Sequence, residues 1–270
     1  MTFKLHTLAV AAAILGSASI ASAAISFDQT VTPAVLFGTG VSNGSWTVDQ
    51  QNNIELGLRG KLRHDASGLA ANTYNSNADG TYSFATGVAP TQSSPTAVWS
   101  FEWAINTNLS GAGTKDLINY TYALGIDSNP SQGTSFSVFD PINGANPSIG
   151  VVCWDHSTGD NSTTAGNGGE TDCSAGNSAN RVAEYAARIA TDNVGQNSWK
   201  AHWFLTAFDP TVDGTYDFYL EAFDAAGASQ AKTAMQIIVG RGGAAVVPEP
   251  GSLALVGLGL VGLMALRRRR

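Results

Sequence analysis

The chain has 270 residues, a net charge of −7 and only 13% charged residues. When Lys4 and the terminal Arg267–Arg270 are set aside, 9 basic residues remain against 21 acidic ones, which leaves the body with a net charge of −12. Such a body repels phosphate backbones, which argues against nucleic acid as a partner. The 30 glycines are typical of a turn-rich extracellular β protein and not of a helical one.

Residues 1–23 have the three parts of a secretory signal peptide. Lys4 supplies a positive start, Leu8 to Leu15 an apolar run, and Ala21-Ser22-Ala23 a small-residue cleavage site. A buried N-terminal helix is the alternative, but it leaves the small residues before Ala24 unexplained. We therefore predict export through the Sec translocon and cleavage by signal peptidase, so that the mature chain begins at Ala24.

Residues 24–240 are predicted to form one exported β-sandwich domain. In Ile54 to Arg63, apolar side chains alternate with polar ones, which is the pattern of a strand with one buried face and one face in water. A turn at Gln51-Asn52-Asn53 joins this strand to another over Ser45 to Gln50. The same alternation predicts further strands at Trp99–Ile105, Tyr120–Ile126 and Trp203–Ala207.

The clearest hairpin is predicted near the end of this domain. Asp213-Gly214 precedes a strand over Thr215–Phe223, a turn follows at Ala225–Ala228, and a second strand returns over Thr233–Val239. This stretch resembles the closing strands of immunoglobulin-like and cadherin-like surface domains. We expect a mainly β fold, an antiparallel two-sheet sandwich that is immunoglobulin-like or jelly-roll-like, with one short helix over Asn180–Ile189.

Cys153 and Cys173 are the only cysteines of the chain. In an oxidising periplasm such a pair most simply forms a disulfide, which would contribute about 3 kcal/mol by restricting the unfolded chain. Two buried free thiols are the alternative. We predict the disulfide, which would tether the segment between the two cysteines.

That tethered segment is rich in oxygen-bearing side chains. Asp155, Asp160, Glu170 and Asp172 are ligand types that calcium accepts, although their spacing does not match a calcium-binding EF-hand loop. A solvated loop uses the same residue types. We expect no cofactor, with calcium at these four residues as the alternative.

The six tryptophans raise the question of carbohydrate binding, because flat aromatic faces can stack on sugar rings. Trp99, Trp103 and Trp203 lie in phase with apolar residues of predicted strands, so we assign them to the core. Trp154 and Trp199 lie nearer to predicted loops. They are therefore the candidates for exposure and for glycan contact.

The sequence contains no recognisable catalytic motif. His64, His156 and His202 lie outside the patterns of metalloproteases and serine hydrolases, and such histidines more often have surface or packing roles. Carboxylates are numerous, but their pairing in a cleft cannot be derived from the sequence. We predict a domain without catalytic residues.

After a linker at residues 241–246, the chain ends in an apolar segment. Leu253 to Leu266 is apolar on every side, and Arg267–Arg270 follows. These fourteen residues span about 21 Å as a helix, less than the roughly 30 Å of a hydrocarbon core, but arginine side chains can snorkel and bilayers can thin. We predict a membrane helix over residues 252–266, with the arginines in the cytoplasm and the body in the periplasm.

The segment over residues 247–270 resembles the PEP-CTERM sorting signal of Gram-negative bacteria. Val247, Pro248, Glu249 and Pro250 match its recognition element, and Arg267, Arg268, Arg269 and Arg270 match its stop-transfer cluster. The resemblance implies retention in the inner membrane and processing by an exosortase, a membrane transpeptidase with a cysteine nucleophile. It also implies a setting of exopolysaccharide and biofilm.

We therefore expect an exported, non-catalytic surface or biofilm-matrix protein. Its expected partners are the exosortase, the Sec translocon, signal peptidase, the inner membrane and exopolysaccharide. An extracellular polysaccharide-acting enzyme and a lectin-like carbohydrate-binding module are the alternatives. Two carboxylates in a deep cleft would favour the enzyme, whereas exposed coplanar aromatic rings would favour the lectin-like module.

Overall fold

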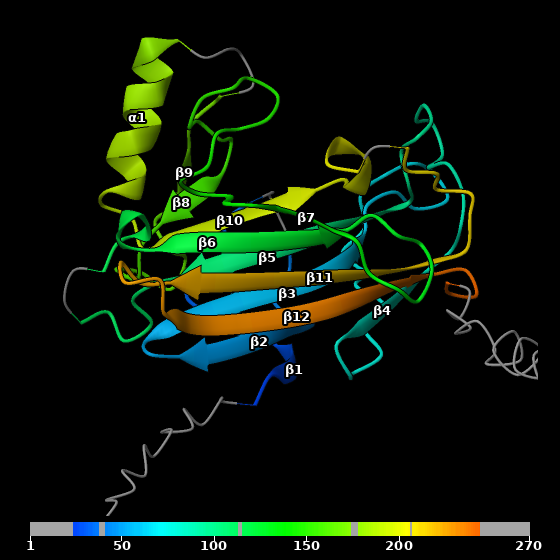
Figure 1. Ribbon diagram of the computed structural model, residues 1–270, viewed down its shortest axis with the longest axis horizontal. Helices are drawn as coiled ribbons and strands as arrows, with labels where there is room; N and C mark the ends of the chain where they lie inside the picture. The colour runs from blue at the N-terminus through cyan, green and yellow to red at the C-terminus, as the bar shows by residue number, and fades with distance from the viewer. Residues whose placement is uncertain (1–23, 38–40, 113–114, 174–177, 206, 244–270) are drawn as a thin grey trace, which may run out of the picture.

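The computed structural model describes residues 24–37, 41–112, 115–173, 178–205 and 207–243. Within them, two β-sheets pack face to face, and one α-helix, α1 (Ala179–Ile189), stands beside the strands β8 and β9 (Figure 1). The predicted signal peptide, sorting signal and membrane helix lie outside the described residues. Across the described part of the chain, no helix is both long and apolar enough to cross a bilayer.

The larger sheet, here called sheet A, has seven strands, and every neighbouring pair in it is antiparallel. Asn52 and Asn53 have φ values of 50° and 66° and form the predicted turn between its second and third strands. In spatial order the strands of sheet A are β1 (Ser26–Gln29), β2 (Trp46–Gln51), β3 (Ile54–Leu62), β5 (Trp99–Asn106), β10 (Val194–Trp199), β8 (Ser157–Gly159) and β9 (Gly169–Glu170).

The smaller sheet, sheet B, has five strands and is mixed. In spatial order they are β4 (Thr81–Phe84), β12 (Ser229–Val239), β11 (Gly214–Phe223), β6 (Thr121–Asp127) and β7 (Phe136–Phe139). The expectation of a purely antiparallel sandwich is wrong at one edge, because β4 pairs parallel to β12. The chain crosses from β3 in sheet A to that far edge of sheet B, so β4 is not part of a hairpin.

The main hydrophobic core lies between the two sheets, where the predicted alternations place it. Leu58 of β3 pairs with Trp103 of β5, and Phe218 of β11 pairs with both Met235 of β12 and Ile126 of β6. All five side chains are at most 4% exposed. The mainly β fold, the closing hairpin and the short helix are thereby confirmed.

The predicted strand at Trp203–Ala207 is wrong. Residues Ala201–Trp203 form a short 3-10 helix, η2, directly after β10. The apolar alternation there covers only three positions. That is too short to distinguish a strand from one turn of a helix.

The outer face of sheet A is buried as well, which corrects the expectation that the polar side of β3 faces water. Glu55, Arg59 and Lys61 are at most 3% exposed. The segment that leads into β2, here called the covering segment, contacts Glu55 through Thr32 and Arg59 through Ser42 and Gly44. It also carries apolar side chains of its own onto this face. Val31 and Phe37 of this covering segment pack with Trp46, Val48 and Ala104.

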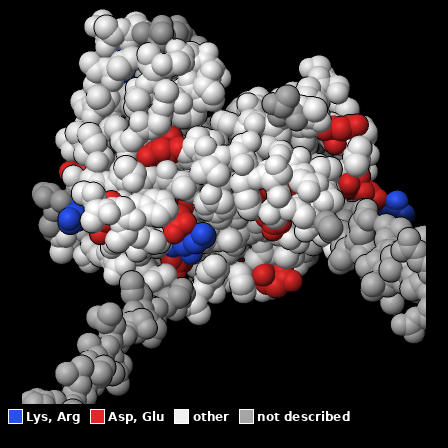
Figure 2. Space-filling view, viewed as in Figure 1, with Lys and Arg blue, Asp and Glu red and all other residues white. Residues whose placement is uncertain are grey.

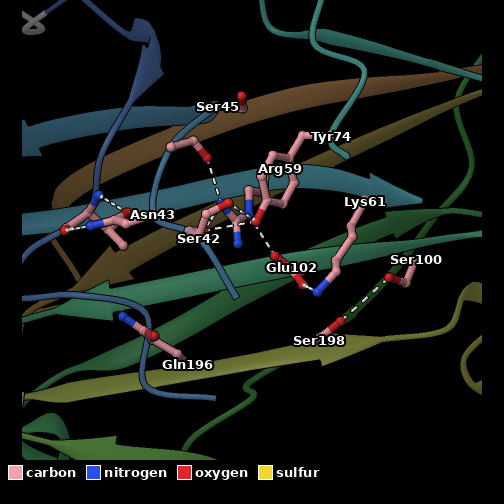
Figure 3. Close-up of polar contacts among 12 residues, drawn as sticks. Ser42, Asn43, Ser45, Arg59, Lys61, Tyr74, Ser100, Glu102, Gln196 and Ser198 are labelled. Atoms are coloured by element: carbon pink, nitrogen blue, oxygen red, sulfur yellow. Dashed lines mark hydrogen bonds and ion pairs between the residues drawn. The ribbon is translucent and has the colours of Figure 1, made fainter. Parts of the chain in front are cut away.

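A buried ionic network ties the covering segment to sheet A (Figure 3). Arg59 donates from Nε to Glu102 Oε2 at 2.6 Å and from Nη1 to the carbonyl oxygens of Ser42 and Gly44 at 3.0 and 2.6 Å. Lys61 Nζ lies 3.3 Å from Glu102 Oε1. Burial lowers the pKa of Lys61, while the Glu102 carboxylate opposes this shift. The alternation of residues in β3 thus identifies its polar face, but it does not show whether that face is exposed to water or buried.

The molecular surface carries the acidic excess of the composition. Figure 2 shows acidic atoms spread over the face in view, with few basic atoms among them. The basic residues Arg59 and Lys61 are buried against Glu102, so they contribute little to the surface. An acidic surface of this kind repels other polyanions, and the absence of nucleic acid among the partners stays a prediction.

Candidate functional site

The predicted disulfide between Cys153 and Cys173 is confirmed, with a Cα to Cα distance of 5.7 Å. Both cysteines are at most 2% exposed. The bond closes a loop that contains β8 and β9, and β8 pairs with β10 at the side of sheet A. The sequence segment directly after Cys153 is thereby held against the end of β10.

An aromatic cluster lies beside this disulfide. Trp199, at the end of β10, has its ring centroid 5.4 Å from that of Trp154 and 4.7 Å from that of Phe204. Phe139 of β7 stacks on Phe204 at 5.1 Å and on Trp154 at 5.9 Å. Side chains from both sheets and from two loops thus form one continuous block of rings, which is a rigid apolar support.

Three rings of this block, those of Trp154, Trp199 and Phe204, form the floor of a surface pocket of about 460 Å³. The volume falls within the range of about 300 to 1,000 Å³ that is typical of small-ligand sites. The lining combines aromatic rings with a few polar side chains, as such sites commonly do. The residues that line the pocket are Asn146, Ser148, Ile149, Trp154, Asp155, Cys173, Trp199, Trp203 and Phe204.

Local hydrogen bonds hold the wall of the pocket in place. Asn146 donates from Nδ2 to the Cys153 carbonyl at 3.1 Å and accepts from the Ser148 backbone N–H at 2.9 Å. Trp154 donates from Nε1 to the Gly144 carbonyl at 2.9 Å. These bonds leave Ser148 and Asp155 exposed at the mouth. The wall is therefore preorganised, and its exposed polar groups can interact with a ligand.

The placement of the tryptophans differs from the prediction in an informative way. Trp154 and Trp199, predicted to be exposed, are each only 2% exposed, because the other rings of the cluster cover them. Trp203, predicted to belong to the core, is 52% exposed. The η2 turn after β10 places it at the pocket rim instead of between the sheets. Glycan contact by Trp154 and Trp199 stays a prediction.

His156 lies behind the pocket and is only 1% exposed. Its Nε2 lies 2.6 Å from the Pro141 carbonyl, and its Nδ1 lies 3.0 Å from Asn197 Nδ2. Nε2 therefore carries the proton and donates to Pro141, while Nδ1 accepts from Asn197. Burial lowers the pKa of His156 to about 3, so the ring is neutral at physiological pH. It is a packing residue.

The four acidic residues named as calcium ligands are distributed around the tethered loop. Asp172 forms an ion pair with Arg181 at 3.3 Å, and Asp160 accepts from the Ser162 backbone N–H at 2.8 Å. Burial, followed by the charges of Asp155 and Asp172, raises the pKa of Glu170. Among the residues that the structure describes, no three acidic, histidine or cysteine side chains form a group that could hold a metal ion.

One signal in the sequence could have located the pocket. Between Trp199 and Phe204, four of six consecutive residues carry aromatic rings, namely Trp199, His202, Trp203 and Phe204. So dense a run cannot place every ring in one core, because successive side chains point in different directions. The run therefore predicts that at least one of these rings is exposed at the surface.

Comparison with known proteins identifies the C-terminal end of the chain. Residues 246–270 match the PEP-CTERM protein-sorting motif, which confirms the resemblance stated above. The motif indicates export and membrane-associated sorting, with an exosortase as the processing partner. No curated protein and no solved structure matches the chain.

Proposed function

We propose that the chain is a non-catalytic surface or extracellular-matrix protein whose body binds a ligand through the aromatic pocket. The observation that carries the proposal is the PEP-CTERM motif at residues 246–270, joined to a sandwich with a preformed pocket. In this proposal the Sec translocon exports the chain, signal peptidase removes residues 1–23, and the membrane helix over residues 252–266 holds it until the exosortase acts. The body then reaches the cell surface or the biofilm matrix.

The disulfide supports this route. A bond between two fully buried cysteines forms and persists in an oxidising compartment such as the periplasm. Its loop carries one wall of the pocket, so the pocket would be complete only after export. Sorting and binding are thus linked by the folding of this loop.

The chemistry of the pocket supports a binding role. Asp155 is the one carboxylate among the described residues that line it. Hydrolysis of a glycosidic bond commonly uses two carboxylates that flank the bond. His156, the nearby base, is buried with both ring nitrogens engaged. The lining is therefore better suited to holding a ligand than to proton transfer.

One observation favours the second candidate, an extracellular polysaccharide-acting enzyme. The raised pKa of Glu170 is a property of general acids, and the Asp155 charge that contributes to it belongs to the pocket lining. If this pair is catalytic, Glu170→Gln and Asp155→Asn should each abolish the release of reducing sugar from a polysaccharide. Absence of hydrolysis by the unaltered protein on the substrates that it binds would reject this candidate.

Fractionation of the host with and without its exosortase tests the proposed function. We expect the body to reach the surface or the medium without its C-terminal signal only when the exosortase is present. Glu249→Ala should retain the protein in the membrane fraction, whereas Arg241→Ala should not, because Arg241 precedes the motif and is 94% exposed. Identical fractionation in both hosts would overturn the proposal.

A further inference from the structure

We infer that the aromatic pocket binds an uncharged pyranose unit of a polysaccharide, with Trp203 as the ring on which the sugar stacks. The inference rests on the proposed function and specifies the ligand class of that site. It also assigns the leading role to a residue other than Trp154 and Trp199, which the sequence pattern had favoured.

The exposure of Trp203 is the first observation. The other five tryptophans of the chain are at most 2% exposed, whereas Trp203 is 52% exposed. A single exposed apolar side chain is ordinary, but this indole ring adjoins a concave surface that is itself lined by aromatic rings, which is typical of a ligand site. The position of Trp203 at the rim allows its ring to cover one side of a ligand that sits on the floor.

The arrangement of apolar and polar groups is the second observation. A pyranose has flat faces of C–H groups and an equatorial belt of hydroxyl groups, so it needs aromatic surface on its faces and hydrogen-bond partners around its edge. The pocket offers Trp203 and Phe204 as aromatic surface. Ser148 and Asp155 are the exposed polar side chains at its mouth. Asp155 Oδ1 accepts from Asn197 Nδ2 at 3.4 Å, and a purely apolar ligand would displace water from the rest of this carboxylate without supplying a donor.

Charge selects the class of sugar. Asp155 is the one charged side chain among the described residues that line the pocket. The body around it carries a net charge of −12 between Ala24 and Leu266, with 9 basic and 21 acidic residues. A uronic acid would be repelled by both. Lys200 lies outside the lining, with its Nζ 5.8 Å from the centre of the Trp203 ring, where it can orient the indole.

Rigidity of the site is the third observation. The disulfide at Cys153, the hydrogen bonds of Asn146 and the stacked rings below the floor hold the pocket in shape without a ligand. A preformed site loses little conformational entropy on binding, which helps a single sugar unit to bind measurably. Repeated units along a polysaccharide, and many copies of the protein in a matrix, would then supply avidity.

Isothermal titration calorimetry on the exported protein, purified from the fraction in which it accumulates, tests the inference. The probes are cellohexaose, xylohexaose and mannohexaose as uncharged oligosaccharides, and hexagalacturonate as the anionic one. We expect at least one uncharged probe to bind and the anionic probe to bind more weakly than that one. Trp203→Ala should weaken binding by about tenfold or more, because a stacked aromatic contact is lost.

Phe136→Ala is the matched control. Phe136 is also an exposed aromatic residue, at 40%, but it lies on β7 against Tyr219 and outside the pocket. Its loss should leave binding unchanged. Because Trp203 is half exposed, Trp203→Ala should keep the thermal stability of the unaltered protein, and unfolding curves of both variants verify this.

Three outcomes would overturn the inference: no binding of any uncharged probe, binding that survives Trp203→Ala, or tighter binding of hexagalacturonate. The readout does not depend on sorting. If the sugar binds but fractionation is independent of the exosortase, the proposed function fails while the ligand class stands. If sorting is confirmed but these probes fail, the ligand class alone is wrong.

Discussion

Acidification from pH 7 to pH 5 should destabilise the protein through His156. This side chain is only 1% exposed, and both ring nitrogens are engaged with Pro141 and Asn197. Burial lowers its pKa from 6.5 to about 3. The unfolded chain takes up a proton below about pH 6.5, whereas the folded protein does so only near pH 3. The stability that the neutral ring contributes is therefore complete above pH 6.5 and is lost progressively as the pH falls towards 3.

The loss of stability on acidification can be calculated from the lowered pKa of His156. Each pH unit between the two pKa values is worth about 1.36 kcal/mol, so the interval from pH 6.5 to pH 5 removes about 2 kcal/mol from the free energy of unfolding. Asp140 and Glu55 have raised pKa values because of burial, and protonation of these carboxyl groups acts in the opposite direction. The contribution of His156 must therefore be isolated by comparison with a variant.

His156→Phe is that variant, since it keeps a ring against Trp154, whose centroid lies 5.4 Å away, and removes the titrating group. It should cost about 1 to 3 kcal/mol at pH 7, because the Pro141 carbonyl loses its buried donor. Urea unfolding at pH 7 and pH 5, followed by tryptophan fluorescence, gives the free energies. The difference between the free energies of unfolding of the unaltered protein and His156→Phe should be about 2 kcal/mol smaller at pH 5 than at pH 7. A difference in the free energy of unfolding that is the same at both pH values would refute the reasoning.

Three further predictions concern the disulfide, the buried ion pairs and the topology. Reduction of the bond between Cys153 and Cys173 should lower the free energy of unfolding by about 3 kcal/mol in urea titrations, and labelling without reductant should detect no thiol; two reactive thiols would contradict the bond. Glu102→Gln should lower the free energy of unfolding by about 3 kcal/mol or more in the same assay, because two buried cations lose their counter-ion. Glu221→Gln, which removes the partner of half-exposed Lys232, should lower it by less than about 1 kcal/mol. Equal losses in the two variants would disprove the role of burial. A phosphatase reporter fused after Asp224 should be active in the periplasm, and activity of a cytoplasmic reporter at that position would reject the predicted orientation.

Six strands, β2, β3, β5, β6, β11 and β12, were predictable because each has an alternating face that enters one core, whereas β1, β4, β7, β8, β9 and β10 were not predicted. The Ile54 to Leu62 strand, β5 and the closing hairpin all follow this rule. The second, outer core was not predictable in the same way. The polar residues Arg59 and Lys61 alternate as a solvated face would, and only the return of the chain over sheet A reveals that they are buried with Glu102 as their shared counter-ion.

The candidate site was predictable in composition but not in geometry. The cysteine pair and the nearby tryptophans were visible in the sequence, and the disulfide followed from counting. Which tryptophan faces water depends on whether β10 continues past Trp199, and local periodicity over three residues cannot decide that. The 3-10 turn at η2 exchanged the expected roles, so that Trp203 became the exposed ring and Trp199 part of the floor.

The pocket lies on the side of the sandwich where aromatic rings fill the space between the two sheets. Along one side, β12 lies close to β2 and β3, and Thr233 donates directly to the Thr47 carbonyl at 3.1 Å. On the β10 and β7 side, aromatic rings fill the space, and Phe139 meets Trp199 at 5.9 Å across the gap between the sheets. The disulfide-bonded loop contributes Trp154, Asp155 and Cys173 to the pocket lining beside these rings, and the η2 turn contributes Trp203.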